Sequence, residues 1–168
     1  MEAIFNRRSI RKYQDKPLEK EKVEKLLRAG MQAPSAVNQQ PWEFIVVDDR
    51  NLLNKLSQMS PYAKPVAGSA VSIVLLANSD RFKVDTAWHQ DMGAAAENIL
   101  LQAADLGLGA VWMGVSTSEP VSEYVKDFFK LPDNILPFCV IAVGYPDGQE
   151  NKFVDRYDES RIHLNAWK

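Results

Sequence analysis

Four short apolar segments, separated by stretches with helical periodicity, most constrain what this chain can fold into. Short runs rich in Val, Ile and Leu are typical of buried strands, and here they cover residues 42–48, 70–77, 110–115 and 138–144. The intervening patterns predict helices over residues 18–33, 51–59, 87–106 and 120–129. Strands that alternate with helices indicate the α/β or the α+β class. Propensity alone leaves the relative directions of the strands open.

Two of the predicted helices have distinctive faces. The helix over residues 18–33 is amphipathic and ends at Pro34, and one of its faces carries Val23, Leu26, Leu27, Gly30 and Met31. The helix over residues 87–106 is the longest and stops at Gly107, and its small residues 93–96 permit close contact with another backbone. The tail from residue 145 onward shows little periodicity but is apolar enough to dock on something, a second subunit being one candidate surface, through Tyr157, Ile162, Leu164 and Trp167.

Size and composition favour a single globular domain over residues 1–168. Apolar residues make up 46% of the chain and charged residues 25%, which are ordinary globular values. A formal net charge of −2 argues against nucleic-acid binding, since there is no basic excess to neutralise phosphates. Neither a signal peptide nor a membrane-spanning segment is predicted. The lone Cys139 lies in an apolar strand segment, so we expect a cytoplasmic protein without disulfides.

A basic cluster stands near the start of the chain, in Arg7-Arg8-Ser9-Ile10-Arg11. Guanidinium groups beside a hydroxyl suit a phosphate, because Arg binds it bidentately and keeps its charge. The alternative is a solvated basic end of a first helix. The apolar neighbours Ile4 and Phe5 argue that the segment is anchored, and charged groups anchored near apolar surface usually have a partner.

The second informative segment is Pro34-Ser35-Ala36-Val37-Asn38-Gln39-Gln40-Pro41-Trp42. Small and amide residues between two prolines suit a fixed loop that lines a planar polar ring. The alternative is a routine helix-to-strand connection with ordinary Pro and Asn turn chemistry. Taken together and in this order, the two segments resemble the flavin-binding signature of the nitroreductase family.

That resemblance implies the nitroreductase-like fold, an α+β architecture with a central, mixed, mostly antiparallel sheet flanked by helices. It also implies FMN as the cofactor and an intertwined, obligate homodimer with the flavins at the interface. Carried over residue by residue, Arg7 matches the phosphate-binding arginine, Arg8 and Ser9 match its polar neighbours, and Arg11 falls near the pyrimidine edge of the flavin. The ring contacts expected from the other subunit are Pro34, Ser35, Ala36 and Asn38.

Two further segments gain a role from the resemblance. Val111, Trp112, Met113 and Gly114 take the positions whose backbone borders the isoalloxazine, although Trp112 and Met113 also suit the core. The glycines before them are not a dinucleotide fingerprint, because they follow a helix and precede a strand. Arg156 matches a basic residue that returns to the flavin phosphate; the alternative is a surface arginine paired with Asp155 or Asp158. Larger members often carry a lysine where this chain has Val154.

The expected function is that of an FMN-dependent oxidoreductase. Hydride from NAD(P)H would pass through flavin N5 to a small oxidised acceptor, such as a nitroaromatic or a quinone, in ping-pong order. The flavin performs this chemistry, so no side chain is nominated as a catalytic acid or base. His89, His163 and Cys139 lack metal-ligand spacing, and no metal is expected. The alternatives are a specialised flavin branch, for reductive dehalogenation or enoate-type reduction, and a non-catalytic flavin-binding or storage dimer.

Overall fold

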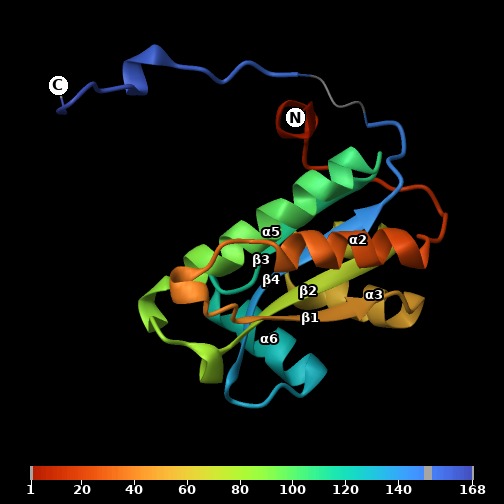
Figure 1. The fold of residues 1–168 in the computed structure, drawn as a ribbon. Coiled ribbons are helices and arrows are strands. Elements are labelled where there is room, and N and C mark those ends of the chain that lie inside the picture. The colour runs from red at the N-terminus through yellow and green to blue at the C-terminus, as the bar shows by residue number, and fades with distance from the viewer. Residues whose placement is uncertain (1, 150–152, 168) are drawn as a thin grey trace.

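The structure is a computed structural model that describes residues 2–149 and 153–167 (Figure 1). Its sheet has the strand order β1-β2-β4-β3, and each neighbouring pair is antiparallel. A parallel bridge between Ser9 and Ala110 adds the N-terminal segment to the outer edge of β3, so the sheet is mixed and mostly antiparallel. The strands are β1 (Trp42–Val47), β2 (Val71–Asn78), β3 (Gly109–Gly114) and β4 (Ile135–Gly144).

Helices cover both faces of this sheet. In chain order they are α1 (Glu2–Asn6), α2 (Lys20–Met31), α3 (Arg50–Leu56), α4 (Lys64–Gly68), α5 (Trp88–Asp105) and α6 (Glu119–Phe129). The apolar faces of α2 and α5 pack on one side of the sheet, whereas α3, α4 and α6 pack on the other. Short 3-10 turns occupy Ala36–Asn38, Ser57–Met59, Ser79–Arg81, Asp85–Ala87 and Glu159–Arg161. The sequence predicts the longer helices and every strand of this sheet, but neither α1 nor α4.

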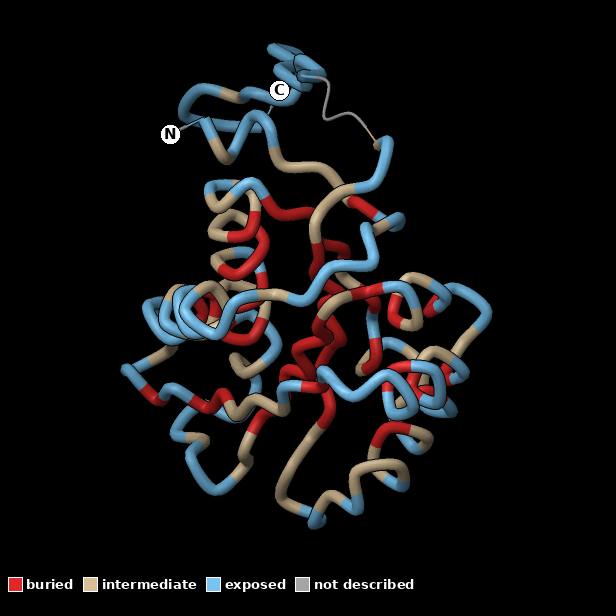
Figure 2. Tube along the Cα trace, turned by 90° about the vertical axis from the view of Figure 1, so that its right-hand side faces the viewer, coloured by how far each residue is buried: buried red, intermediate tan, exposed pale blue. Residues whose placement is uncertain are grey.

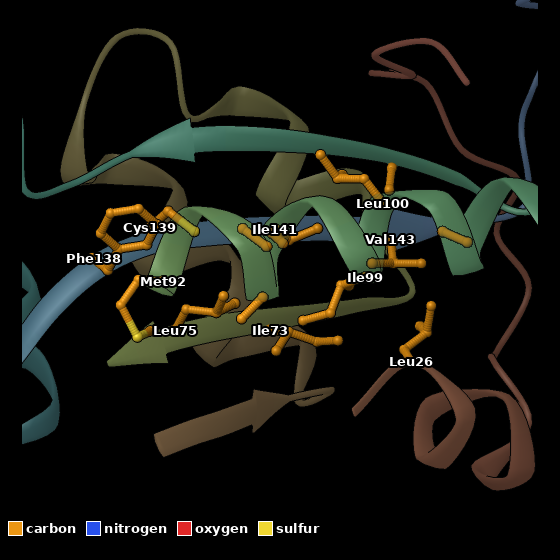
Figure 3. Close-up of a cluster of buried hydrophobic side chains, with 14 of the residues drawn as sticks. Leu26, Ile73, Leu75, Met92, Ile99, Leu100, Phe138, Cys139, Ile141 and Val143 are labelled. Carbon is orange, nitrogen blue, oxygen red and sulfur yellow. The ribbon is translucent and has the colours of Figure 1, made fainter. Parts of the chain in front are cut away.

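The core forms where strand side chains meet the two layers of helices. Figure 3 shows Ile73 of β2 and Ile141 of β4 in one cluster with Met92 and Ile99 of α5, and with Leu26 of α2 at its edge. All five side chains are fully buried, and burial of such groups is the main stabilising contribution in a domain of this size. The buried residues run through the middle of the molecule (Figure 2). Met31 departs from the predicted apolar face, because at the last position of α2 its side chain is exposed.

Strand β4 begins earlier than the sequence pattern predicts. It starts at Ile135 rather than at residue 138 and contains Pro137. Pro137 pairs with Leu76 next to a register shift between Leu75 and Leu76. A proline cannot donate to the ladder and is tolerated in a strand at such an irregularity, which explains why the pattern alone starts the strand too late.

The two termini lie at the same end of the molecule (Figures 1 and 2). There the Phe5 and Phe153 rings meet edge to face, with their centroids 6.2 Å apart. Beyond this contact the tail runs in an extended path, and its apolar side chains, Trp167 above all, are exposed to solvent (86% for Trp167). In the described part of the chain, no helix is both long and apolar enough to cross a membrane.

Candidate functional site

The basic segment near the N-terminus is fixed against the outer edge of β3. The Ile10 amide donates to the Ala110 carbonyl at 3.0 Å, and the Ile10 side chain is fully buried. Three residues further on, the Tyr13 hydroxyl donates to the Ile10 carbonyl at 2.6 Å and lies 3.1 Å from the Ala142 carbonyl of β4. The arginines on either side of Ile10 therefore extend from an anchored backbone rather than from a loose terminus.

Four arginines surround one cavity of about 490 Å³. Gln149 braces its floor, because its amide donates to the Ser9 carbonyl at 2.9 Å and accepts the Arg11 amide at 3.1 Å. The residues that line this basic cavity are Arg7, Arg8, Ser9, Arg11, Gln149, Val154 and Arg156. Guanidinium groups converging with a hydroxyl form a donor set suited to a doubly charged phosphate.

Arg156 reaches this cavity from the far end of the chain. The sequence left open that it pairs with Asp155 or Asp158. In the structure Asp158 instead holds Arg161, with 3.0 Å between the Arg161 Nε and the Asp158 Oδ2, while the Asp155 carboxylate caps the Tyr157 amide at 3.0 Å. Residues separated by most of the sequence thus meet at one hollow.

Arg7 and Arg8 have contacts within the chain as well. The Arg7 Nε lies 3.5 Å from a Glu97 carboxylate oxygen on α5. The Arg8 side chain donates to the carbonyls of Phe5 and Arg7, at 3.0 and 2.7 Å. These contacts orient the guanidinium groups at the end of α1, where they line the basic cavity.

A second cavity, of about 850 Å³, adjoins the basic cavity through Arg11, which lines both. We call it the strand cavity, because one wall is strand β3. Its lining comprises Arg11, Lys12, Ser60, Pro61, Tyr62, Lys64, Pro65, Val111, Trp112, Met113, Gly114, Thr117, Ser118 and Val121. The predicted residues 111–114 and Arg11 therefore lie together, and residues 60–65 supply a wall that the sequence does not predict.

The backbone of β3 presents polar groups at the edge beyond its pairing with β4. Ala110 directs its carbonyl away from β4, because it accepts the Ile10 amide. Peptide groups alternate in direction along a strand, so those of Trp112 and Gly114 point the same way. The side chains of Val111 and Met113 are buried in the core, whereas Trp112 packs edge to face on Phe138 with 5.4 Å between the centroids. This stretch thus combines a core role for its side chains with an available backbone edge.

The loop over residues 34–40 lines neither cavity of its own chain. It has an unusual backbone: Val37, Asn38 and Gln40 have φ angles of 46°, 55° and 46°, in the left-handed region that non-glycine residues rarely adopt. It is tied to the first turn of α5, since the Ala36 amide donates to the Asp91 carboxylate at 2.9 Å. Pro34, Ser35, Ala36 and Asn38 are therefore kept apart from Arg7 within one chain.

Several residues of these sites carry no clear sequence signal. Lys12 follows Arg11 directly but lies just outside the signature segment. Gln149, Tyr62 and Lys64 also line the cavities, and only the folded chain brings these three near. The sequence suggests only that Asp91 is a carboxylate favoured by the helix dipole, because its contact with the loop at residue 36 is long-range.

In the described chain no three His, Cys, Asp or Glu residues gather as metal ligands would. Burial raises the pKa of the Cys139 thiol well above its usual range, which leaves it unreactive.

Comparison with known proteins agrees with this geometry. Residues 4–70 and 66–145 match the profile of the Nitroreductase family. A protein of Methanothermobacter thermautotrophicus, provisionally named an NADH dehydrogenase/NAD(P)H nitroreductase, is 45% identical over 99% of this chain and 87% of its own length. A crystal structure of a provisionally named NADH oxidase from Clostridium acetobutylicum is 57% identical, with a TM-score of 0.97 over 98% of this chain and 99% of that one. An FMN-dependent nitroreductase from Clostridium difficile is 35% identical, with a TM-score of 0.91 over 99% of this chain and the whole of the other. The chain thus belongs to the nitroreductase family of oxidoreductases.

Proposed function

We propose that this protein is an FMN-dependent oxidoreductase that takes hydride from NAD(P)H and reduces a small oxidised acceptor, such as a quinone or a nitroaromatic. The observation that carries the proposal is Arg11, which lines both the basic cavity and the strand cavity. A phosphate in the first and a flat polar ring in the second would belong to one molecule that passes Arg11. The FMN-dependent relative from Clostridium difficile, which matches this chain along its whole length, supports the same ligand.

The basic cavity fits the single terminal phosphate of FMN. Its four arginines and Ser9 converge on one hollow of about 490 Å³, and the strand cavity beside it has an apolar floor from β3 and α6. In this arrangement Arg7 and Arg156 would hold the phosphate from opposite ends of the chain. Arg8 and Ser9 would complete its hydrogen bonds, so FMN is favoured over FAD, whose phosphates form a pyrophosphate.

The strand cavity fits the isoalloxazine ring of the same molecule. When bound there, FMN would supply the hydride chemistry, since its N5 accepts hydride from a nicotinamide and the electrons then pass to the acceptor. The peptide groups of Trp112 and Gly114 along the β3 edge would orient the ring. The Arg11 guanidinium would stabilise negative charge at the pyrimidine edge. No Asp, Glu, His or Cys is among the described residues that line this cavity, so we nominate no catalytic acid or base.

A positive field characterises the same cavity. Lys12 and Lys64 line it together with Arg11, and cations on a concave wall raise the local concentration of anions. Phosphate groups of a reduced dinucleotide, or an acceptor that gains negative charge on reduction, would therefore be attracted. Donor and acceptor would use this one cavity in turn, which implies ping-pong kinetics.

The complete site would require a second copy of the chain. The loop over residues 34–40 lines neither cavity of its own chain, and its exposed Val37 and Asn38 face outward. We propose that this loop contacts the ring bound by the other subunit of an obligate homodimer. The exposed apolar tail around Trp167 would dock on that second subunit and stabilise the pair.

The decisive experiment is identification of the bound cofactor. The purified protein should be yellow, and mass analysis of the released chromophore should give the mass of FMN. FAD in its place, or no flavin after reconstitution, would contradict the proposal. Oxidation of NADH and NADPH with a generic quinone then separates an enzyme from a flavin-storage dimer, because a storage protein binds FMN without turnover.

A further inference from the structure

Asp91 is the one charged residue that is buried in the described part of the chain, with 4% of its surface exposed. It stands in the first turn of α5. One carboxylate oxygen accepts the Ala36 amide at 2.9 Å, and the other accepts the side-chain amide of Gln39. Burial of a carboxylate is costly unless its oxygens are hydrogen-bonded, so these two contacts are what Asp91 is placed to make.

Gln39 cannot turn its side-chain amide around. Its carbonyl oxygen accepts the backbone amides of Lys83 and Val84, at 2.9 and 3.0 Å. Its nitrogen therefore faces Asp91, and the side chain is as buried as its partner, with 4% exposed. The hydrogen-bond polarity of the pair is fixed from both sides, because Gln39 must donate and Asp91 must accept.

The two anchors at Ala36 and Gln39 enclose the strained part of the loop. Val37 and Asn38 lie between them and Gln40 follows, all with positive φ. Strain of this kind persists only where the surroundings determine the backbone, and it concentrates at ligand sites. The same loop carries the four residues that we assign to the flavin ring.

We propose that Asp91 is a positioning residue for the cofactor: through Ala36 and Gln39 it holds the loop over residues 34–40 in the conformation that contacts the flavin ring. Asp91 itself touches no cofactor atom in this scheme. The proposal rests on the function proposed above. It adds a specific cause for the loop geometry, namely a buried carboxylate more than fifty positions away in the sequence.

The test is reversal of the hydrogen-bond polarity. Asp91→Asn replaces one acceptor by a donor that faces either the Ala36 amide or the Gln39 amide, and Gln39 cannot reverse in response. We expect FMN affinity to fall on the order of tenfold, and the visible circular dichroism of the remaining bound flavin to change. The matched control is Asp105→Asn, an exposed carboxylate at the other end of α5, which should leave affinity and spectrum unchanged.

Restoring the polarity should restore the site. In the double variant Asp91→Asn with Gln39→Glu, the new carboxylate at position 39 accepts from the new amide at position 91 and still accepts the amides of Lys83 and Val84. FMN affinity and the flavin spectrum should return to within about threefold of the original protein, since the amides of Ala36, Lys83, Val84 and position 91 all meet acceptors again. Only the long contact of the Gln39 Nε2 atom with the Val84 carbonyl, at 3.3 Å, is lost. Failure of this double variant to recover, while it folds, would overturn the proposal.

A purely structural role gives a different result. If Asp91→Asn lowers the melting temperature of the apoprotein but leaves FMN affinity and the flavin spectrum unchanged, Asp91 does not position the cofactor. Should Asp91→Asn not fold, Asp91→Glu replaces it: this variant keeps the charge and both acceptors but displaces the Ala36 amide, and unaltered flavin binding would overturn the proposal. Failure of the proposed function is distinguishable, because then the unmodified protein would bind no FMN.

Discussion

Ile10 packs directly on Gly109. A β-carbon added to Gly109 would lie 2.5 Å from the Ile10 Cγ2 atom, a distance that real side chains do not tolerate. The missing side chain lets the N-terminal segment approach the edge of β3, where the Ile10 amide reaches the Ala110 carbonyl. Gly109 therefore allows the segment over residues 7–11 to pack against β3, and this packing sets the position of Arg11.

Gly109→Ala should therefore weaken flavin binding and lower stability together. The added methyl must push Ile10 outward, and overpacking of a buried site costs about 1–3 kcal/mol. Urea denaturation of the apoprotein and titration with FMN measure the two effects. Gly68→Ala is the control, because a β-carbon there meets no atom within 4 Å. Equal behaviour of the two variants would mean that the approach of Ile10 does not position Arg11.

Arg7→Ala should lose FMN affinity without losing much stability. A charge-assisted contact contributes roughly 1.5–3 kcal/mol, which corresponds to a Kd that is ~10–100-fold weaker. The ion pair of Arg7 with Glu97 is partly exposed, and such pairs add little to folding. Lys12 is an unsuitable control because it lines the strand cavity.

Arg28→Ala supplies the matched comparison for Arg7→Ala. Arg28 is an exposed arginine on α2 that is paired with Glu24 at 2.7 Å, and it lines neither proposed cavity. The measurement is fluorescence titration of each apoprotein with FMN. Similar losses for both variants would indicate general electrostatics rather than a phosphate site.

The fold could be predicted from the sequence further than the site could. Strands and long helices follow from periodicity, because burial of one face imposes a regular spacing. The ends of elements were harder, as Pro137 inside β4 shows, since the bulge that accommodates it depends on the neighbouring strand. Helix α4 is short and begins with Lys64 and Pro65, so it offers too few residues for a periodic signal.

The candidate site could likewise be predicted only in part from the sequence. Arg7, Arg11 and Arg156 could be named from motifs, and the structure places them around one cavity, although their role as ligands stays a prediction. The contacts of Asp91 with Ala36 and of Gln149 with Ser9 could not be named. These contacts join segments far apart in the chain, and no local pattern encodes which buried carboxylate or amide will meet which backbone group.

Tyr13 should make stability fall at alkaline pH. Burial raises the pKa of its hydroxyl above the ordinary value, so the folded chain binds this proton more tightly than the unfolded chain. The contribution of this proton to the free energy of unfolding is therefore fully present below about pH 10, the ordinary pKa of tyrosine. It is lost as the pH rises above that value. Urea denaturation between pH 8 and pH 11 measures the effect.

Tyr13→Phe isolates that contribution from other groups that titrate at high pH. The variant lacks the hydrogen bond to the Ile10 carbonyl and should be less stable than the original by about 0.5–1.5 kcal/mol at pH 8. The difference in the free energy of unfolding between the two proteins should become smaller as the pH rises, because only the original protein has a hydroxyl to ionise at this position. Stability curves that stay parallel up to pH 11 would show that Tyr13 does not titrate in this way.

Steady-state kinetics should be of the ping-pong type. One cavity beside Arg11 would serve both NAD(P)H and the acceptor, so the oxidised nicotinamide must leave before the acceptor enters. Double-reciprocal plots at several quinone concentrations should give parallel lines. Intersecting lines would require both substrates to bind together, and a single shared cavity could not accommodate that.

Two inactive variants should restore one working site when they share a dimer. The loop carrying Asn38 and the segment carrying Arg7 contact α5 at Asp91 and Glu97, six positions apart, and at 3.6 residues per turn these lie roughly 120° apart around the helix. Within one chain they therefore face different directions. Arg7→Ala removes the phosphate contact, and Asn38→Asp places a carboxylate beside a ring that becomes negative on reduction. In a mixed dimer, one site combines both defects while the other combines the intact Arg7 with the intact Asn38.

Co-expression with two different affinity tags allows the mixed dimer to be purified and assayed. Its quinone reductase activity should approach half that of the original dimer, since one of two sites is complete, whereas each variant alone stays inactive. Dimers of each single variant, tagged in the same way, are the control for effects of the tags. If mixed dimers form from folded chains and remain inactive, Arg7 and Asn38 do not meet across the interface. The site would then lie within one subunit, and the loop over residues 34–40 would need another role for its strained backbone.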